Sequence, residues 1–257
     1  MAKMTKRRDS DADAEPAIKP SASKRARKTV DASEFKSAVV GDDLRLPLTD
    51  AEIFYLPDFV SVQKAEQWLR QIAKIDGWYR PTLKMYGREI TQSREIAAYA
   101  TDRSLSVKYS GTTVQMRYDY PPVLREIQRC VEAQLETTFN HVMLNKYDSG
   151  NVYIGKHADN LENRVIASVS LGAERTFILS HKKPPTDSPA KATGDPFSRA
   201  KRANHDVADP YHRSLKLASG SLLVMQGETQ QHWKHEIPKE PRVKHQRISL
   251  TFRQLVF

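Results

Sequence analysis

The chain has 257 residues, of which 39% are hydrophobic, so it is long enough for one large domain with a packed core. Lys and Arg outnumber Asp and Glu by 41 to 31, and the formal charge of +10 favours an anionic partner such as nucleic acid. The single cysteine, Cys130, excludes a disulfide framework and favours a reducing compartment, and no apolar run is long enough to span a membrane.

Residues 1–45 have the composition of a disordered basic tail, with Phe35 as their only aromatic residue. Such a segment buries too little apolar surface to offset the entropy lost on ordering. Two basic clusters, Lys6–Arg8 and Lys24–Lys28, are typical of nuclear import signals or phosphate-binding arms, although a solvated tail has the same composition. We expect a nuclear protein, and a monomer.

The folded domain is predicted to cover residues 46–257. Residues 53–59 read as a strand closed by a turn, and Ser61 is placed to cap a helix that runs to about Lys74. A second amphipathic helix opens at Pro121-Pro122, and Cys130 falls on its apolar pattern as a small buried side chain.

Short strands dominate the chain from His141 onward, which indicates a sandwich or barrel. Their predicted ranges are 141–147, 152–157, 165–171, 176–180, 221–225 and 246–252. The pattern of short strands is interrupted at residues 181–211, which are rich in Pro, Lys, Arg, Asp and Ser. A connection of this length is usually functional or disordered.

The first chemical motif is His157-Ala158-Asp159, at the end of a predicted strand. Residues two apart on a strand point to the same side, so the imidazole and the carboxylate converge. Two histidines and one carboxylate, with coordination positions left open, are the ligands of non-haem iron(II) oxygenases. The second histidine must come from further along, where His232 and His235 both qualify and spacing alone does not choose between them.

Residues 247–253 alternate polar and apolar, with Ile248, Leu250 and Phe252 on the face that belongs in a core. The opposite face carries Arg247 and Arg253 inward, where a dicarboxylate would satisfy both guanidiniums through charge-assisted hydrogen bonds. An exposed strand with both arginines in water is the alternative.

Together these motifs resemble the AlkB family of Fe(II)- and 2-oxoglutarate-dependent dioxygenases, over roughly residues 80–253. The resemblance rests on Asn145-Lys146-Tyr147, then on His157-x-Asp159 with the strand and turn Ser168–Arg175 after it, then on His235 and the ending Leu250–Arg253. The chain looks closest to the nuclear branch of the family that repairs duplex DNA.

The resemblance implies a mainly β fold with flanking helices (α+β), built on a double-stranded β-helix or jelly-roll core. It implies His157, Asp159 and His235 as iron ligands. It implies a 2-oxoglutarate site made by Asn145, Tyr147, Arg247, Ser249, Thr251 and Arg253. The implied reaction uses Fe(II), O2 and 2-oxoglutarate to oxidise the alkyl group of 1-methyladenine or 3-methylcytosine, releasing succinate, CO2 and formaldehyde.

A base must leave the stack to reach such a site, and the family pattern places Tyr109 as its stacking partner, with Tyr86 on the pocket wall. The connection at residues 181–211 is expected to bind the phosphate backbone of the nucleic acid. A turn near the entrance of the pocket, which contains Arg242, is expected to bind it as well. The residues predicted for this role are Lys182, Lys183, Lys201, Arg202 and Arg242.

Two positions depart from the family pattern. Where many relatives place an acidic residue that contacts the base, this chain has Leu161, so we expect Glu162 to take that role. The apolar finger of duplex-acting relatives is shorter here, with Trp78 expected as a packing residue and Tyr79 as a wedge or packing residue. An RNA demethylase of the same family and an inactive nucleic-acid-binding jelly-roll therefore stay open as alternatives.

Overall fold

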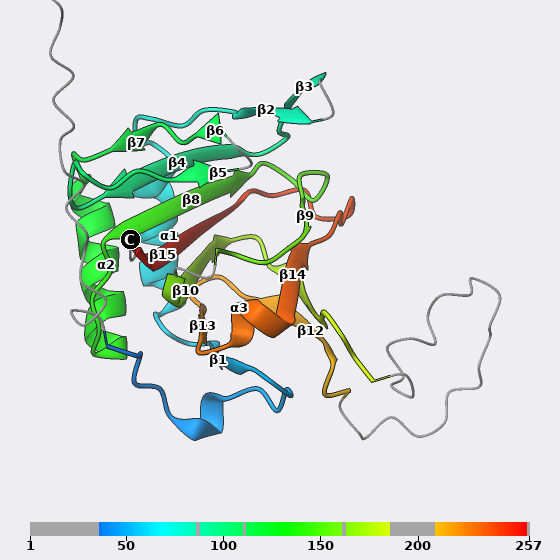
Figure 1. Ribbon diagram of the computed structural model, residues 1–257. Helices are drawn as coiled ribbons and strands as arrows, with labels where there is room; N and C mark the ends of the chain where they lie inside the picture. Colours follow the sequence, from blue (N-terminus) through cyan, green and yellow to red (C-terminus); the bar gives the residue numbers. More distant parts are fainter. Residues whose placement is uncertain (1–35, 86–87, 110–111, 161–162, 186–208, 256–257) are drawn as a thin grey trace, which may run out of the picture.

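Two β-sheets face each other, and helices cover the outer side of the larger sheet (Figure 1). The computed structural model describes residues 36–85, 88–109, 112–160, 163–185 and 209–255. In these ranges no helix is both long and apolar enough to cross a membrane.

In the described residues the larger sheet has seven strands in the order β1-β13-β10-β15-β8-β4-β7. They are β1 (Glu52–Leu56), β4 (Glu95–Ala100), β7 (Met116–Arg117), β8 (His141–Tyr147), β10 (Asn163–Gly172), β13 (Leu222–Gln226) and β15 (Arg247–Leu255). All neighbours pair antiparallel except β4 and β7.

The smaller sheet has the order β12-β11-β14-β9 within the same ranges. It consists of β9 (Ile154–His157), β11 (Arg175–His181), β12 (His212–Leu217) and β14 (Trp233–Ile237). Two short pairs lie outside both sheets, namely β2 (Thr82–Met85) with β3 (Arg88–Thr91) and β5 (Lys108–Tyr109) with β6 (Thr112–Thr113). The architecture is the predicted mainly β double-stranded β-helix.

The helices are α1 (Val62–Ile72), α2 (Pro122–Leu135) and the single turn α3 (Thr229–His232), with a 3-10 turn η2 at Asp42–Leu44. The Ser61 side chain accepts a hydrogen bond from the amide of Lys64, which confirms the predicted cap of α1. Cys130 on α2 was predicted to be buried but is only half-buried against the core, because it lies at the margin of the apolar face of the helix.

Alternation along the strands divides the interior into two layers. Ile248, Leu250 and Phe252 of β15 join the core between the larger sheet and the helices. A second core fills part of the space between the two sheets and includes Ile53, Leu179 and Trp233. The remaining inward positions of β8 and β15 are mostly polar, so the space between the sheets also holds a cavity with polar groups on these two strands.

Several elements differ from the sequence-based ranges. The segment 36–45, assigned to the tail, packs on the domain: Ala38 is buried, and its amide donates to Gln226 Oε1. Strand β14 was not predicted, because Trp233 and His235 occupy two of its three inward positions and only Ile237 is aliphatic. The indole of Trp78 is half-buried and donates to the Ile72 carbonyl, so Trp78 is a packing residue as expected.

Candidate active site

A cavity of about 300 Å³ opens between the two sheets, and inward residues of β8 and β15 form much of its wall. The register pairs Arg247 with Tyr147, Ser249 with Asn145, and Arg253 with His141. Every residue that the sequence predicts for iron or 2-oxoglutarate lines this cavity. These are Asn145, Tyr147, His157, Asp159, His235, Arg247, Ser249, Thr251 and Arg253.

Arg247 lies at one end of the cavity and is 2% exposed. Its Nη2 donates to Ser170 Oγ at 2.9 Å, and its guanidinium lies 5.3 Å from the centre of the Tyr147 ring. Within the described residues, Nε and Nη1 have no hydrogen-bond partner. Burial lowers the pKa of Arg247 from its ordinary value, yet the group stays charged at neutral pH. A buried cation with two unsatisfied donors is a receptor for an anionic ligand.

Arg253 and Asp159 form an ion pair at the other end, with Nη2 donating to Oδ1 at 2.9 Å. The Asp159 amide donates to Gln230 Oε1, which fixes the backbone of the segment after β9. Burial alone would raise the pKa of Asp159, but the charges of Arg253, His235 and His157 outweigh burial and lower it to about 2. The carboxylate is therefore ionised at neutral pH, as a metal ligand must be.

His157 and His235 face each other from paired positions on β9 and β14, with ring centres 4.3 Å apart. His157 Nδ1 lies 2.8 Å from the Gly155 carbonyl, so the Nδ1 proton is held there and Nε2 is left as an electron-pair donor. Phe177 stacks on His235 at 5.3 Å. Burial lowers the pKa of His235 to about 4, against the opposing charge of Asp159, so the ring is neutral at pH 7.

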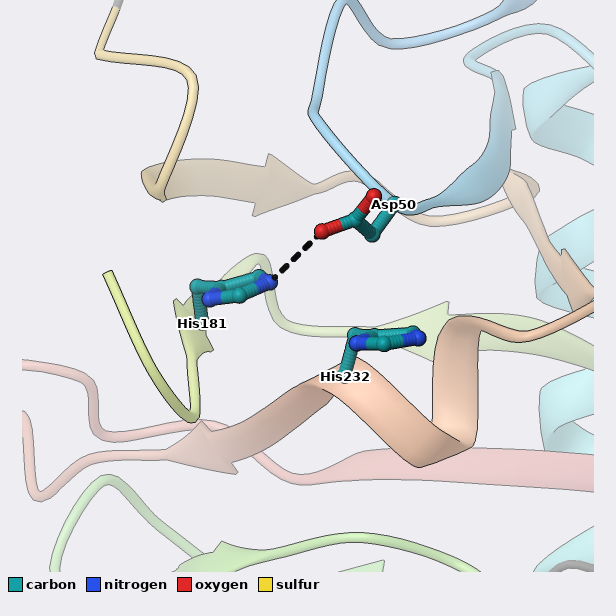
Figure 2. A group of neighbouring side chains, drawn as sticks. All are labelled: Asp50, His181 and His232. Carbon is teal, nitrogen blue, oxygen red and sulfur yellow. Dashed lines mark hydrogen bonds and ion pairs between the residues drawn. The ribbon is translucent and has the colours of Figure 1, made fainter. Parts of the chain in front are cut away.

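His157, Asp159 and His235 line the same cavity, but their ligand atoms do not all lie within 4.8 Å of one another. His235 Nε2 and Asp159 Oδ2 are 4.0 Å apart. In the described residues, the one trio whose ligand atoms all lie within 4.8 Å is a different one: Asp50, His181 and His232 (Figure 2). This candidate His-Asp-His group does not line the cavity that contains Arg247.

Two basic residues of the pocket were missed by the sequence reasoning. His141, which pairs with Arg253 in the register, is 1% exposed, and neither ring nitrogen has a partner among the described residues. Burial and the charge of Arg253 lower its pKa to about 3. Arg94 is buried and donates from Nε to Asn145 Oδ1 at 2.9 Å. His141 could have been predicted, because it lies four residues before Asn145 and therefore on the same face of the strand. Arg94 directly precedes β4, and no sequence pattern around it predicts that it enters the pocket.

The predicted nucleic-acid residues are only partly described. Lys182, Lys183 and Arg242 are exposed, and Lys182 Nζ donates to the Gln230 carbonyl near the Asp159 segment. Tyr109 lies on β5, and only its backbone is described. The remaining predictions fall outside the described residues, and these are Tyr86, Glu162, Lys201 and Arg202.

Comparison with known proteins agrees with this geometry. Residues 52–253 match the family model of the 2OG-Fe(II) oxygenase superfamily. The chain is 34% identical to an Arabidopsis thaliana "DNA oxidative demethylase ALKBH2" over 79% of its own length and 66% of that protein. It is 30% identical to the Homo sapiens "Alpha-ketoglutarate-dependent dioxygenase alkB homolog 3" over 80% of its length and 67% of the relative. The solved structure titled "The structure of OsALKBH1" matches with a TM-score of 0.49 at 15% identity, covering 79% of this chain and 97% of that one, a likeness too distant to carry weight.

Proposed function

Because the chain belongs to the AlkB family of 2OG-Fe(II) dioxygenases, we propose that it removes alkyl groups from 1-methyladenine and 3-methylcytosine in DNA. The aligned region spans about two thirds of these relatives, 66% of the plant protein and 67% of the human one. The name of the plant relative, a DNA oxidative demethylase, supports this substrate, and the name of the human relative supports an alpha-ketoglutarate-dependent dioxygenase of the AlkB type.

The observation that carries the proposal is the buried guanidinium of Arg247, whose Nε and Nη1 atoms have no partner among the described residues, in the cavity that also holds His157, Asp159 and His235. A dicarboxylate would satisfy these donors with one carboxylate while its other end reaches the metal ligands. The donor set, two imidazoles and one ionised carboxylate, fits iron(II). The residues therefore fit both the metal and the cosubstrate that the family requires.

We place the iron at His157, Asp159 and His235, and not at Asp50, His181 and His232, for a geometric reason. 2-Oxoglutarate must contact the iron and an anion receptor at the same time, so both must share one cavity. Arg247 and Arg253 lie in the cavity with the first trio, whereas the second trio does not line it. Sequence spacing left His232 and His235 open, and the shared cavity favours His235.

When bound, the iron and 2-oxoglutarate supply the oxidation, with succinate, CO2 and formaldehyde as the products beside the restored base. The protein supplies binding, orientation and exclusion of water. Arg247 and Tyr147 would anchor the far carboxylate, and Asn145, held by Arg94, would position the cosubstrate from the side. Arg253 keeps Asp159 ionised and oriented, and Phe177 fixes the plane of His235.

The nucleic-acid side of the proposal rests on charge. The formal charge of +10 and the exposed side chains of Lys182, Lys183 and Arg242 support backbone contacts that do not read sequence. We also propose a nuclear location, which the clusters Lys6–Arg8 and Lys24–Lys28 support. A fluorescent fusion that stays outside the nucleus would contradict that location without affecting the enzymatic proposal.

The decisive experiment is formaldehyde release from matched 1-methyladenine oligonucleotides offered as single-stranded DNA, duplex DNA and RNA, with iron(II) and ascorbate. We expect formaldehyde from DNA, dependent on 2-oxoglutarate and abolished by Asp159→Ala. His245→Ala, which removes an exposed imidazole outside the cavity, is the matched control and should keep turnover. Product from RNA alone would move the substrate class to RNA. No product on any strand, with iron and 2-oxoglutarate bound, would refute nucleic-acid demethylation.

A further inference from the structure

Asp50, His181 and His232 come together from three separate segments on the side of the smaller sheet (Figure 2). Asp50 lies in the turn before β1, His181 is the last residue of β11, and His232 is the last residue of α3. None of the three lines the cavity of the proposed active site. The proposed function therefore leaves this group unexplained.

The ligand atoms of the trio are nearly in place for one ion. Asp50 Oδ2 lies 3.3 Å from His181 Nε2, and one ligand atom from each residue lies within 4.8 Å of the others. The two imidazole rings are almost parallel, with an interplanar angle of 11° and centres 5.9 Å apart. Tetrahedral ligands about 2.1 Å from a zinc ion are roughly 3.4 Å apart, so closing the site needs a movement of about 1 Å. Asp50 is exposed and the His232 side chain is 37% exposed, so both have room to make it.

Hydrogen bonds that do not involve the three ligand side chains hold the three segments together. The Lys182 amide donates to the His232 carbonyl at 2.7 Å, which joins the segment after β11 to the end of α3. The Trp233 indole donates to the Thr49 carbonyl at 2.8 Å, which joins the turn before β1 to the start of β14. Asp50 itself is held at φ 52°, a left-handed conformation that is strained for a residue with a Cβ. The ligand positions are thus organised by the fold before an ion arrives.

At His232 the surroundings favour a proton on Nε2, which leaves Nδ1 for a metal. At His181 metal binding through Nε2 requires the loss of one hydrogen bond. Glu228 Oε2 lies 3.6 Å from His232 Nε2, so a small movement would let the carboxylate accept the Nε2 proton and leave Nδ1 for the ion. His181 Nδ1 accepts a hydrogen bond from the Lys183 amide at 3.2 Å. Coordination through Nε2 moves the His181 proton to Nδ1 and opens that bond. Lys183 is exposed, so water can take up its freed amide.

We propose that Asp50, His181 and His232 form a second metal site, which binds a divalent transition ion of the zinc type with water completing the coordination. Two imidazoles and one carboxylate are ligands that such ions prefer, whereas Mg²⁺ and Ca²⁺ prefer all-oxygen sites. The ion would tie the turn before β1 to the ends of β11 and α3. Since α3 leads directly into β14, the tie would stabilise the strand that carries His235.

The test is a cobalt(II) titration of metal-free, full-length protein, read by equilibrium dialysis and visible absorption. We expect two ions per chain in the wild type, one in His232→Ala and one in Asp159→Ala. Asp50→Asn keeps the shape and tolerates the left-handed turn but loses the charge, so binding at this site should weaken at least about tenfold. His245→Ala, an exposed histidine away from both groups, should still bind two ions.

The variants separate the two proposals. Unchanged stoichiometry and spectrum in His232→Ala would overturn the second site, and unchanged stoichiometry in Asp159→Ala would overturn the iron assignment. Zinc should also raise the Tm of Asp159→Ala and leave the double variant Asp159→Ala/His232→Ala unshifted, because an ion stabilises only a fold that binds it. His232→Ala should keep demethylation at saturating iron. If His232→Ala lost turnover while Asp159→Ala kept it, the catalytic iron would lie at Asp50, His181 and His232 instead.

Discussion

The Nη2 atom of Arg253 lies 2.9 Å from Oδ1 of Asp159, so the last strand of the larger sheet holds the carboxylate that follows β9 of the smaller one. Burial would favour the neutral acid at this position, and the nearby cation outweighs burial and lowers the pKa of Asp159 to about 2. The ion pair thus both orients the carboxylate and keeps it ionised.

Replacing Arg253 by Met should raise the pKa of Asp159, because burial remains while the largest opposing charge is gone. Protonation then competes with metal binding at a higher pH. We expect the acid midpoint for loss of iron(II) at the catalytic site to move upward, measured by iron affinity between pH 4 and 7 in the His232→Ala background. An unmoved midpoint would show that Arg253 does not control this carboxylate.

Replacing Arg247 by Met should separate binding from stability. Removing one partner of a buried charged pair costs about 3 kcal/mol, so we expect 2-oxoglutarate affinity to fall by more than about 100-fold. The ligand-free protein should keep or increase its Tm, since the variant removes a buried guanidinium with unpaired donors. Calorimetric titration and thermal unfolding provide the two readouts. The exposed Arg242→Met is the control, and near-normal 2-oxoglutarate binding by Arg247→Met would contradict the anchor role.

Glu240→Gln should be strongly destabilising. Glu240 pairs at 3.0 Å with Arg175, which is fully buried, and it accepts further hydrogen bonds from Thr176 and Lys216. Leaving that guanidinium without its anion should cost about 3 kcal/mol in urea unfolding at pH 7. Glu66→Gln, from the exposed pair with Arg70, should cost no more than about 0.5 kcal/mol. Equal effects of the two changes would argue against a special role for the buried pair.

The Glu240 pair also predicts a pH dependence. Although burial opposes ionisation, the hydrogen bonds lower the pKa of Glu240 to about 2 from 4.5. A depressed carboxyl pKa contributes stability that is complete above the unfolded value and is lost as pH falls toward the folded value. The stability difference between wild type and Glu240→Gln should therefore shrink from about pH 4.5 toward pH 2.

His141→Phe should make the protein more resistant to acid. Burial and the charge of Arg253 lower the pKa of His141 to about 3 from 6.5. The unfolded chain takes up this proton below pH 6.5 and the folded chain does not, so stability falls by up to about 1.4 kcal/mol per pH unit as pH drops from 6.5 toward 3. Urea unfolding at pH 7 and pH 5 should show a smaller acid loss in the variant. An equal loss would show that His141 is protonated in the native state.

Much of the fold was accessible from local patterns. Ser61 capped α1 as predicted, and the strand 141–147 was found at its observed bounds, because both signals depend on residues adjacent in sequence. Alternation along residues 247–253 correctly separated the inward arginines from the core residues. Strand β14 was missed, since two of its three inward residues, Trp233 and His235, are not aliphatic.

By itself the sequence determined the chemistry of the donors: the His157-x-Asp159 spacing, the face shared by Arg247 and Arg253, and the basic character of the chain. Only the tertiary structure decided which distant groups meet. Pairing of β9 with β14 brings His157 opposite His235, and the close approach of three chain segments creates the trio of Asp50, His181 and His232. The physical reason is that periodicity fixes the direction of a side chain relative to its own strand, whereas its partners are set by which strands and turns pack together.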